Sequence, residues 1–410
     1  MRTRNAEFDV IVVGAGPAGS VTAEALARAS LRVALLEEHP RVGLPNQCSG
    51  LLSPRTLELA GIAEEVMDGV RFSSARVWSP GGKTLWLRSE SVQAIAVDRP
   101  RFDQILARRA AAAGAALLLG TQAYRFERSE WDVQVDARTG TGELHLRASL
   151  LVGADGAGSQ VARWMGREHK GEIIPAIKAD VAFRNCSTDS IEIFVGNDVA
   201  PGWFGWVVPV GDGIARIGIG AVGTETPRHC FGTFLALVRQ KFGHFAVREV
   251  KRVVLPLGPG RDFVADRMML VGAAAQQTKP TTGGGIYFGI RAARLAAATA
   301  VEAVRYGDCS RRALAEYEQA WRRLDGRELA YERWLRQGFR RLSDRDFDLL
   351  IELLGEPYAQ DLIARLGDAD FPSRLFTPLA TALWKRWLPS QVIEQARHLV
   401  NVESMESVRA

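Results

Sequence analysis

The stretch Phe8-Asp-Val-Ile-Val-Val-Gly-Ala-Gly-Pro-Ala-Gly19, near the start of the chain, decides the fold. Its apolar half is typical of a short strand buried on both faces of a parallel sheet. The residues from Ser20 to Ala29 have the spacing of a helix, and Leu31 to Leu36 form a second apolar run. The order strand, glycine turn, helix, strand predicts a Rossmann-like α/β unit.

Three glycines in this turn have separate tasks. Gly14 permits the tight turn, Gly16 lets the backbone approach a pyrophosphate, and Gly19 lets the helix and strand pack closely. The helix start offers unpaired N–H groups to the phosphates. Glu37 ends the next strand and can accept hydrogen bonds from ribose hydroxyls. The pattern predicts dinucleotide binding, with a glycine turn packed for its own sake as the alternative.

Composition narrows the class of protein. The 410 residues are 47% hydrophobic and 24% charged, which excludes disordered and collagen-like chains. The net charge of +5 comes without a basic patch or recognition motif, so we expect no nucleic-acid partner. The four cysteines are far apart and contain no CxxC pair, which predicts neither a metal site nor an iron–sulfur cluster. No apolar run is long enough to span a membrane, and we expect a cytoplasmic protein.

Sequence patterns further along divide the chain into three regions. Residues 76–97 and 172–222 alternate apolar and polar positions, as antiparallel strands do. Residues 310–342 follow a long, charged helical pattern. We therefore expect an α/β fold in which a Rossmann-like domain is interrupted by an antiparallel β-sheet domain and followed by a helical region. The expected ranges are 1–75, 98–171 and 256–308 for the dinucleotide domain, 76–97 and 172–255 for the β-rich substrate domain, and 309–410 for the helical region.

Two further motifs favour a flavin cofactor. Leu150-Leu-Val-Gly-Ala-Asp155-Gly156 resembles the second signature of FAD-dependent enzymes with the aromatic-hydroxylase fold, although alone it could be a turn with a helix cap. Arg99 matches a position that contacts the cofactor there, with a surface ion pair as the alternative. Gly283-Gly-Gly285 precedes an Ala-rich helix whose start can stabilise negative charge on a flavin ring, or it is a plain helix-start turn.

The chain as a whole resembles the geranylgeranyl reductase family, flavoproteins that saturate isoprenoid double bonds. The similarity spans about residues 8–305. It is carried by Pro45-Asn-Gln-Cys-Ser-Gly50, by Phe204-Gly-Trp-Val-Val-Pro209 with Gly218-Ile-Gly220, and by Lys279-Pro-Thr-Thr-Gly-Gly-Gly285.

The resemblance implies an isoprenoid substrate, FAD as cofactor, and hydride delivery from the reduced flavin N5. It implies NAD(P)H or reduced ferredoxin as electron donor, the latter through a redox partner protein, and no metal. Cys48 is the candidate proton donor, with a buried structural thiol as the alternative. The substrate wall would comprise Trp203, Phe204, Trp206 and Pro209, unless these pack only as core. The residues implied to bind FAD are Gly14, Gly16, Ala18, Gly19, Glu37, Glu38, Cys48, Gly50, Arg99, Asp155, Gly272, Gly283, Gly284, Gly285 and Ile286.

Three positions depart from the family pattern. Phe204 and Val208 stand where the family has tyrosine and phenylalanine, so the chain-length preference is expected to differ. Ala273 replaces an aspartate that bonds the ribityl chain of FAD. A hydrogen bond of this kind is worth roughly 1.5–3 kcal/mol, so we expect FAD to bind less tightly.

Three alternatives remain from sequence alone. The first is an FAD-dependent monooxygenase of the same fold. The second is an electron-transfer flavoprotein at a membrane, which the scattered cysteines disfavour. The third is a protein that keeps the fold without flavin. The Arg-rich helical region, including Trp321-Arg-Arg323 and Trp334-Leu-Arg336, could contact the inner face of a membrane or be a solvated surface.

Overall fold

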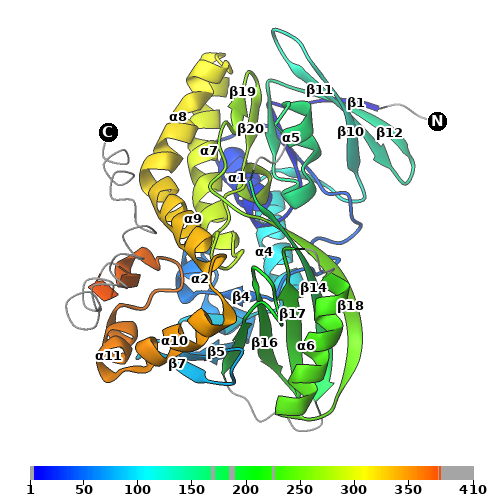
Figure 1. The fold of residues 1–410 in the computed structure, drawn as a ribbon. Coiled ribbons are helices and arrows are strands. Elements are labelled where there is room, and N and C mark those ends of the chain that lie inside the picture. Colours follow the sequence, from blue (N-terminus) through cyan, green and yellow to red (C-terminus); the bar gives the residue numbers. More distant parts are fainter. Residues whose placement is uncertain (1–3, 168–170, 184–189, 224–226, 377, 380–410) are drawn as a thin grey trace.

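The Rossmann-like sheet lies in one half of the molecule (Figure 1). The computed structural model describes residues 4–167, 171–183, 190–223, 227–376 and 378–379. The six strands are parallel except β19, which pairs antiparallel with β20. In spatial order they are β19 (Val264–Ala265), β20 (Met268–Leu270), β13 (Leu150–Gly153), β2 (Val10–Val13), β3 (Val33–Leu36) and β9 (Ala116–Leu118).

Helices pack against this sheet and form one apolar core with it. Helix α1 (Pro17–Arg28) contacts both α4 (Arg99–Ala112) and α7 (Ile286–Tyr306). Ala-rich faces make close helix contacts possible, and Ala23, Ala292 and Ala296 are fully buried. The α/β fold class predicted from the glycine turn is confirmed, with β2 starting two residues later than expected because Phe8 and Asp9 precede the ladder.

The second half is built around a seven-stranded sheet, which lies on the opposite side of the molecule from the Rossmann-like sheet (Figure 1). Neighbouring strands are antiparallel, as predicted, except that β6 and β15 run parallel. In spatial order the strands are β18 (Phe245–Pro256), β14 (Ile173–Phe183), β17 (Ile214–Gly220), β16 (Phe204–Gly211), β15 (Ile191–Val195), β6 (Ser74–Trp78) and β7 (Thr84–Arg88). Helix α6 (Pro227–Phe242), absent from the sequence prediction, buries Phe231 and Phe234 against this sheet.

Two smaller sheets and several short helices complete these halves. The three-stranded sheet is β4 (Leu51–Leu52), β8 (Ala94–Ala96) and β5 (Val70–Phe72). The four-stranded sheet is β1 (Arg4–Glu7), β12 (Gly142–Ala148), β11 (Val133–Thr139) and β10 (Gln122–Arg128). The short helices are α2 (Pro54–Ala60), α3 (Glu64–Met67), α5 (Gln160–Trp164), and the 3-10 turns η1 (Gly156–Gly158) and η2 (Gly272–Ala275).

The helical C-terminal region is packed against both halves rather than free of them. The long helix predicted over residues 310–342 is α8 (Arg311–Trp321) and α9 (Arg327–Phe339), joined by the π-helical η3 (Arg322–Gly326). Helices α10 (Asp344–Gly355) and α11 (Pro357–Leu366) both contact β7. The surface expected for the two Arg-rich segments includes Arg322, Arg323 and Trp334, which are exposed. It does not include Trp321, which joins the main apolar core, or Arg336, which is buried and pairs with Glu172.

No helix within the described ranges is long and apolar enough to cross a bilayer.

Candidate cofactor and substrate site

In the glycine turn, Gly19 is packed closely against backbone, whereas the space beside Gly16 is open. A Cβ added to Gly19 would lie 1.9 Å from the Gly14 carbonyl oxygen, so this position admits only glycine. A Cβ on Gly16 would meet no described heavy atom within 4 Å. Gly16 is also the N-cap residue of α1, whose first N–H groups have no cap from a described side chain. The turn therefore fits a pyrophosphate, which needs both free space and unpaired N–H donors.

Glu37 lies beside this turn with both oxygens engaged. Its Oε2 accepts a hydrogen bond from the Ala15 N–H at 3.0 Å, and its Oε1 contacts His39 Nδ1 at 2.7 Å. A carboxylate has about four acceptor sites, so these bonds leave room for ribose hydroxyls. Glu38 is exposed and accepts from Gln122. The pairing of His39 with Glu37 had no signal in the sequence.

Asp155 caps a helix. Its Oδ1 accepts from the Ser159 hydroxyl at 2.6 Å, and its Oδ2 accepts from the Gln160 N–H at 2.6 Å. These bonds are the helix-cap arrangement, and a contact of Asp155 with cofactor stays a prediction. Desolvation raises the pKa of this carboxyl despite these hydrogen bonds.

Cys48 lies on the loop before β4, close to two buried charges. Arg99 pairs with Asp103 at 2.9 Å, so the ion pair left open by the sequence exists but is buried. Burial raises the pKa of the Cys48 thiol, but the Arg99 guanidinium and the Gly50 N–H outweigh it, and the net pKa is below its ordinary value. The loop therefore holds a thiol that releases its proton more easily than a free cysteine does.

Arg216 ties the Cys48 loop to the seven-stranded sheet. Its Nη1 donates to the Ser49 carbonyl at 2.8 Å and to the Val97 carbonyl at 2.9 Å. A Cβ on Gly50 would lie 2.1 Å from this nitrogen, and Gly50 has a φ of +78°. Lys178 on β14 is also buried within electrostatic reach of Cys48. Arg216 and Lys178 lie on strands for which the sequence analysis predicted no functional residue with a charge.

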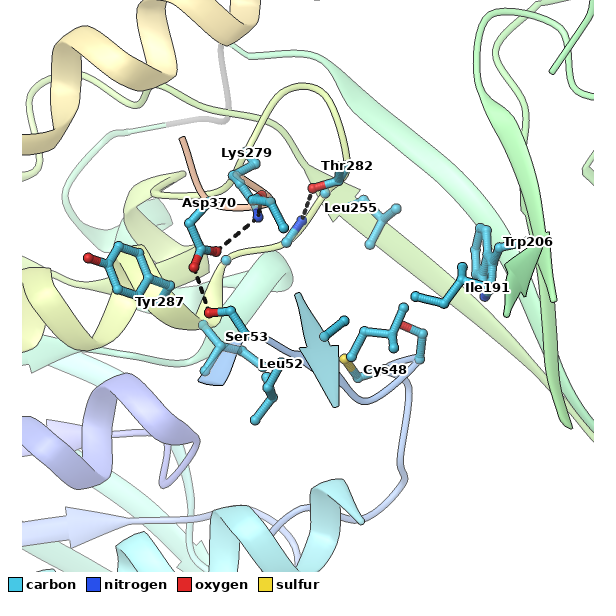
Figure 2. A pocket seen from close by; sticks show the side chains of 18 of the residues that line it. Cys48, Leu52, Ser53, Ile191, Trp206, Leu255, Lys279, Thr282, Tyr287 and Asp370 are labelled. Carbon is cyan, nitrogen blue, oxygen red and sulfur yellow. Dashed lines mark hydrogen bonds and ion pairs between the residues drawn. The ribbon is translucent and has the colours of Figure 1, made fainter. Parts of the chain in front are cut away.

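A cavity of about 350 Å³ lies between the Cys48 loop, the seven-stranded sheet and the start of α7. Figure 2 shows Cys48, Leu52 and Ser53 on one side and Lys279, Thr282 and Leu255 on the other. Its lining is mostly aliphatic and aromatic. Of the predicted site residues, the cavity brings together Cys48, Trp203, Phe204, Trp206, Gly283, Gly284, Gly285 and Ile286.

The aromatic wall of this cavity depends on glycines in the neighbouring strand. Trp206 pairs across the ladder with Gly218, and a Cβ on Gly218 would lie 2.1 Å from its ring. A Cβ on Gly220 would lie 2.3 Å from the Trp203 ring. Phe204 stacks on Trp203 with ring centroids 4.9 Å apart. The glycines matched in the sequence thus provide the space that the two indoles occupy.

Pro209 does not line the cavity, contrary to expectation. Successive side chains of a strand point to opposite faces, so Pro209 in β16 faces away from Trp206. It is buried, and a role as a substrate contact finds no geometric support.

The glycine loop before α7 closes the cavity. Lys279 and Gly284 are joined by a backbone hydrogen bond of 2.9 Å, and Gly283 has a φ of +71°. A Cβ on Gly285 would lie 2.5 Å from Thr278, so this glycine is required by packing. Gly272 packs against Ala18, where an added Cβ would lie 2.9 Å away. The exposed backbone of Gly284 and the uncapped start of α7 fit a flat, electron-rich ring.

Two buried side chains that the sequence missed hold these segments. Glu332 on α9 is fully buried and accepts hydrogen bonds from the Thr281 hydroxyl and, at 3.3 Å, from the Thr281 N–H. Burial raises its pKa to about 7, although Lys279 lowers it. Gln277 accepts from the Gly272 N–H at 2.7 Å and donates to Tyr317. Both lie in runs that read as ordinary charged or polar sequence.

The described residues contain no group of three histidine, cysteine or acidic side chains that could hold a metal ion. Cys186 lies outside the described residues.

Comparison with known proteins places the chain in a family. Residues 7–327 match the family model described as FAD binding domain. The digeranylgeranylglycerophospholipid reductase 1 of Methanothermobacter thermautotrophicus is 32% identical over 84% of this chain and 90% of its own length. A reductase of the same description from Methanococcoides burtonii is 31% identical over 95% of this chain and 97% of its own.

Solved structures agree on the fold. A geranylgeranyl bacteriochlorophyll reductase-like protein from Thermoplasma acidophilum has a TM-score of 0.82 at 24% identity, covering 93% of this chain and all of that one. The p-nitrophenol 4-monooxygenase of Pseudomonas putida has a TM-score of 0.68 at 17% identity, covering 88% of this chain and 97% of that one. The chain therefore belongs to the FAD binding domain family and, within it, to the geranylgeranyl reductases.

Proposed function

We propose that this protein is an FAD-dependent reductase that saturates isolated C=C bonds of an isoprenoid chain. The observation that carries the proposal is the cavity of about 350 Å³, which has an aromatic wall, a glycine loop and one thiol around it. An isolated alkene offers no polar group to recognise, so an apolar cavity of this kind suits it. The names of the reductases at 31–32% identity support the same substrate class.

The residues around the glycine turn and the cavity would hold FAD. Gly14, Gly16 and Gly19 would receive the pyrophosphate, and Glu37 the ribose, while Gly283 and Gly284 would lie against the ring. The remaining predicted contacts are Ala18, Glu38, Cys48, Gly50, Arg99, Asp155, Gly272, Gly285 and Ile286. When bound and reduced, FAD supplies a hydride to one carbon of the alkene.

The protein's own side chains supply the rest of the chemistry. Trp203, Phe204 and Trp206 exclude water and hold the chain, which matters because an unactivated alkene reacts only when closely positioned. Cys48 Sγ holds the proton for the second alkene carbon. Arg99 beside it lowers the thiol pKa and so eases release of that proton.

Two further partners complete the proposal. NAD(P)H, or reduced ferredoxin as a protein partner, would supply electrons. The protein would take up the lipid at the inner face of a membrane. Its net charge of +5 would attract it to anionic headgroups, and exposed apolar side chains on the C-terminal helices would insert among the lipids. The exposed side chains are Leu324, Trp334, Leu349, Leu350, Tyr358, Leu366 and Phe376. Flotation with anionic liposomes tests this contact, and absence of the protein from the lipid layer would remove it.

The central experiment follows the product of a single substrate. The FAD-loaded protein is incubated anaerobically with geranylgeraniol and an excess of dithionite, which reduces the flavin again after each turnover, and the product is analysed by mass spectrometry. We expect the addition of one pair of hydrogens per double bond. The Cys48→Ala variant should retain its flavin absorbance but give slower product formation, with Cys230→Ala as control because Cys230 is buried away from the cavity.

Two results would contradict the proposal. Incorporation of oxygen in the presence of air, without saturation, would indicate a monooxygenase of the same fold. Protein that purifies without flavin absorbance and cannot be reconstituted with FAD would indicate a chain that has lost its cofactor.

A further inference from the structure

A second cavity, of about 270 Å³, adjoins the first and has a different chemical character. Where the first is lined by aromatic and aliphatic side chains, the second is lined mainly by polar and charged ones. Its lining consists of Ser53, Pro54, Arg55, Ser91, Val92, Gln93, Gly367, Asp368, Ala369 and Asp370.

The two cavities are neighbours because the same residues separate them. Ser53, Gln93, Ala369 and Asp370 line both cavities. Lys279 donates to the Ala369 carbonyl at 2.7 Å and pairs with Asp370 at 3.2 Å, and Asp370 accepts from the Ser53 hydroxyl at 2.5 Å (Figure 2). An amphiphilic molecule lying across this boundary would have its apolar chain in one compartment and its polar end in the other.

Three cations pair with two carboxylates at the boundary, and Arg55 is the one of the three that lines the second cavity. Asp370 is already paired with Lys279, and Asp368 is paired with Arg374 at 3.0 Å. Arg55 is the third cation: its Nη1 donates to Asp368 at 3.1 Å and its Nη2 at 3.2 Å, and it lies 3.8 Å from Asp370. Its side chain is 41% exposed, so a ligand can reach the guanidinium without a rearrangement of the core.

We propose that the second cavity binds the phosphate group at the polar end of an isoprenoid lipid, and that Arg55 recognises it. This inference rests on the proposed function, because it assigns the polar end of that same substrate. A guanidinium presents a planar fork of donors that matches phosphate oxygens. Ser91, at the cavity wall, adds a hydroxyl beside it, which Gln93 holds by donating to the Ser91 Oγ at 3.0 Å.

The chain offers a matched control for Arg55. Arg55 and Arg374 both pair with Asp368, and both lie over the Phe371 ring, at 5.3 and 4.8 Å from its centroid. Only Arg55 is among the residues that line either cavity. A role in holding the segment 367–371 would make the two arginines equivalent, whereas a role in binding phosphate would not.

The test compares geranylgeranyl monophosphate with geranylgeraniol. Binding to the oxidised, FAD-loaded protein is measured by quenching of tryptophan fluorescence, since Trp203 and Trp206 line the adjoining cavity. Charge-assisted hydrogen bonds predict that the wild type binds the phosphate at least about tenfold more tightly than the alcohol. Arg55→Gln should abolish this preference by weakening only the phosphate, and Arg374→Gln should preserve it.

Three outcomes would overturn the inference. The preference could persist in Arg55→Gln, or be lost equally in Arg374→Gln, and either result would make Arg55 a structural residue. If inorganic phosphate alone competes as well as the lipid phosphate, the site takes a free anion and the assignment to a lipid end is wrong.

The same protein separates this inference from the proposed function. If the wild type binds both ligands with the expected preference but reduces the double bonds of neither, the reductase proposal fails while the phosphate site stands. If it reduces the double bonds of both ligands, and the two arginine variants have the same preference for phosphate over alcohol, the phosphate site fails and the reductase proposal stands.

Discussion

The dinucleotide turn and the aromatic wall of the cavity both depend on glycine, but for different reasons. In the turn, a Cβ on Gly19 would meet the backbone carbonyl oxygen of Gly14. In the wall, Gly218 faces the ring of Trp206, a side chain from the neighbouring strand. Backbone sets the first requirement within a few residues, whereas a tertiary partner sets the second. The glycines of the turn can therefore be predicted from local sequence spacing, whereas the role of those in the wall depends on which strands pair.

The largest expected effect separates two glycines of the turn. Gly19→Ala should destabilise the protein by at least about 3 kcal/mol, because its Cβ would lie 1.9 Å from the Gly14 carbonyl oxygen. Gly16→Ala should change the stability of the flavin-free protein by less than about 1 kcal/mol, since its Cβ enters open space. It should nevertheless lose FAD. Urea unfolding of flavin-free protein and flavin absorbance after reconstitution measure the two effects separately.

If Gly16→Ala retains FAD with unchanged affinity, the open space is not where the pyrophosphate lies. The contrast between a packing glycine and a ligand glycine in one turn would then be wrong.

The same difference between local and tertiary determinants explains how far each region could be predicted from the sequence. The strand, turn and helix around Gly14 were foreseen because they are contiguous and use strong local signals. Asp370 and Lys279 are 91 residues apart, and no period or spacing brings them together. Glu332 lies within the charged helical pattern of residues 310–342, which gave no sign that tertiary packing buries this side chain completely. Pro209 was placed at the substrate wall because its motif was matched as a unit, while strand alternation turns it away.

A pH-dependent effect tests the loop that closes the cavity. Burial raises the pKa of Glu332 from 4.5 to about 7, against the lowering effect of Lys279 and with a further rise from Glu328. A raised acid pKa means that the folded state holds the proton more tightly, so stability is greatest at low pH. Stability should fall as pH rises from 4.5 through 7, by on the order of 3 kcal/mol.

Glu332→Gln imitates the protonated acid and should remove this fall. Urea unfolding at several pH values should show wild type and variant equal near pH 4 and the variant more stable near pH 8. Glu316→Gln, on the exposed side of α8, is the control and should leave the wild-type profile unchanged. Parallel curves for wild type and Glu332→Gln would mean that the carboxyl stays ionised in the fold.

The smallest expected effect concerns the aromatic wall. Gly218→Ala puts a methyl group 2.1 Å from the Trp206 ring, so the indole must move or the strands must separate. We expect a loss of about 1–3 kcal/mol, less than in the turn, because a side chain yields more easily than a carbonyl of the backbone. The displaced ring should also weaken geranylgeraniol binding. Gly140→Ala, whose Cβ would meet no described heavy atom within 4 Å, provides the matched control. A variant that loses stability but binds the lipid normally would show that Trp206 packs as core without contacting the chain.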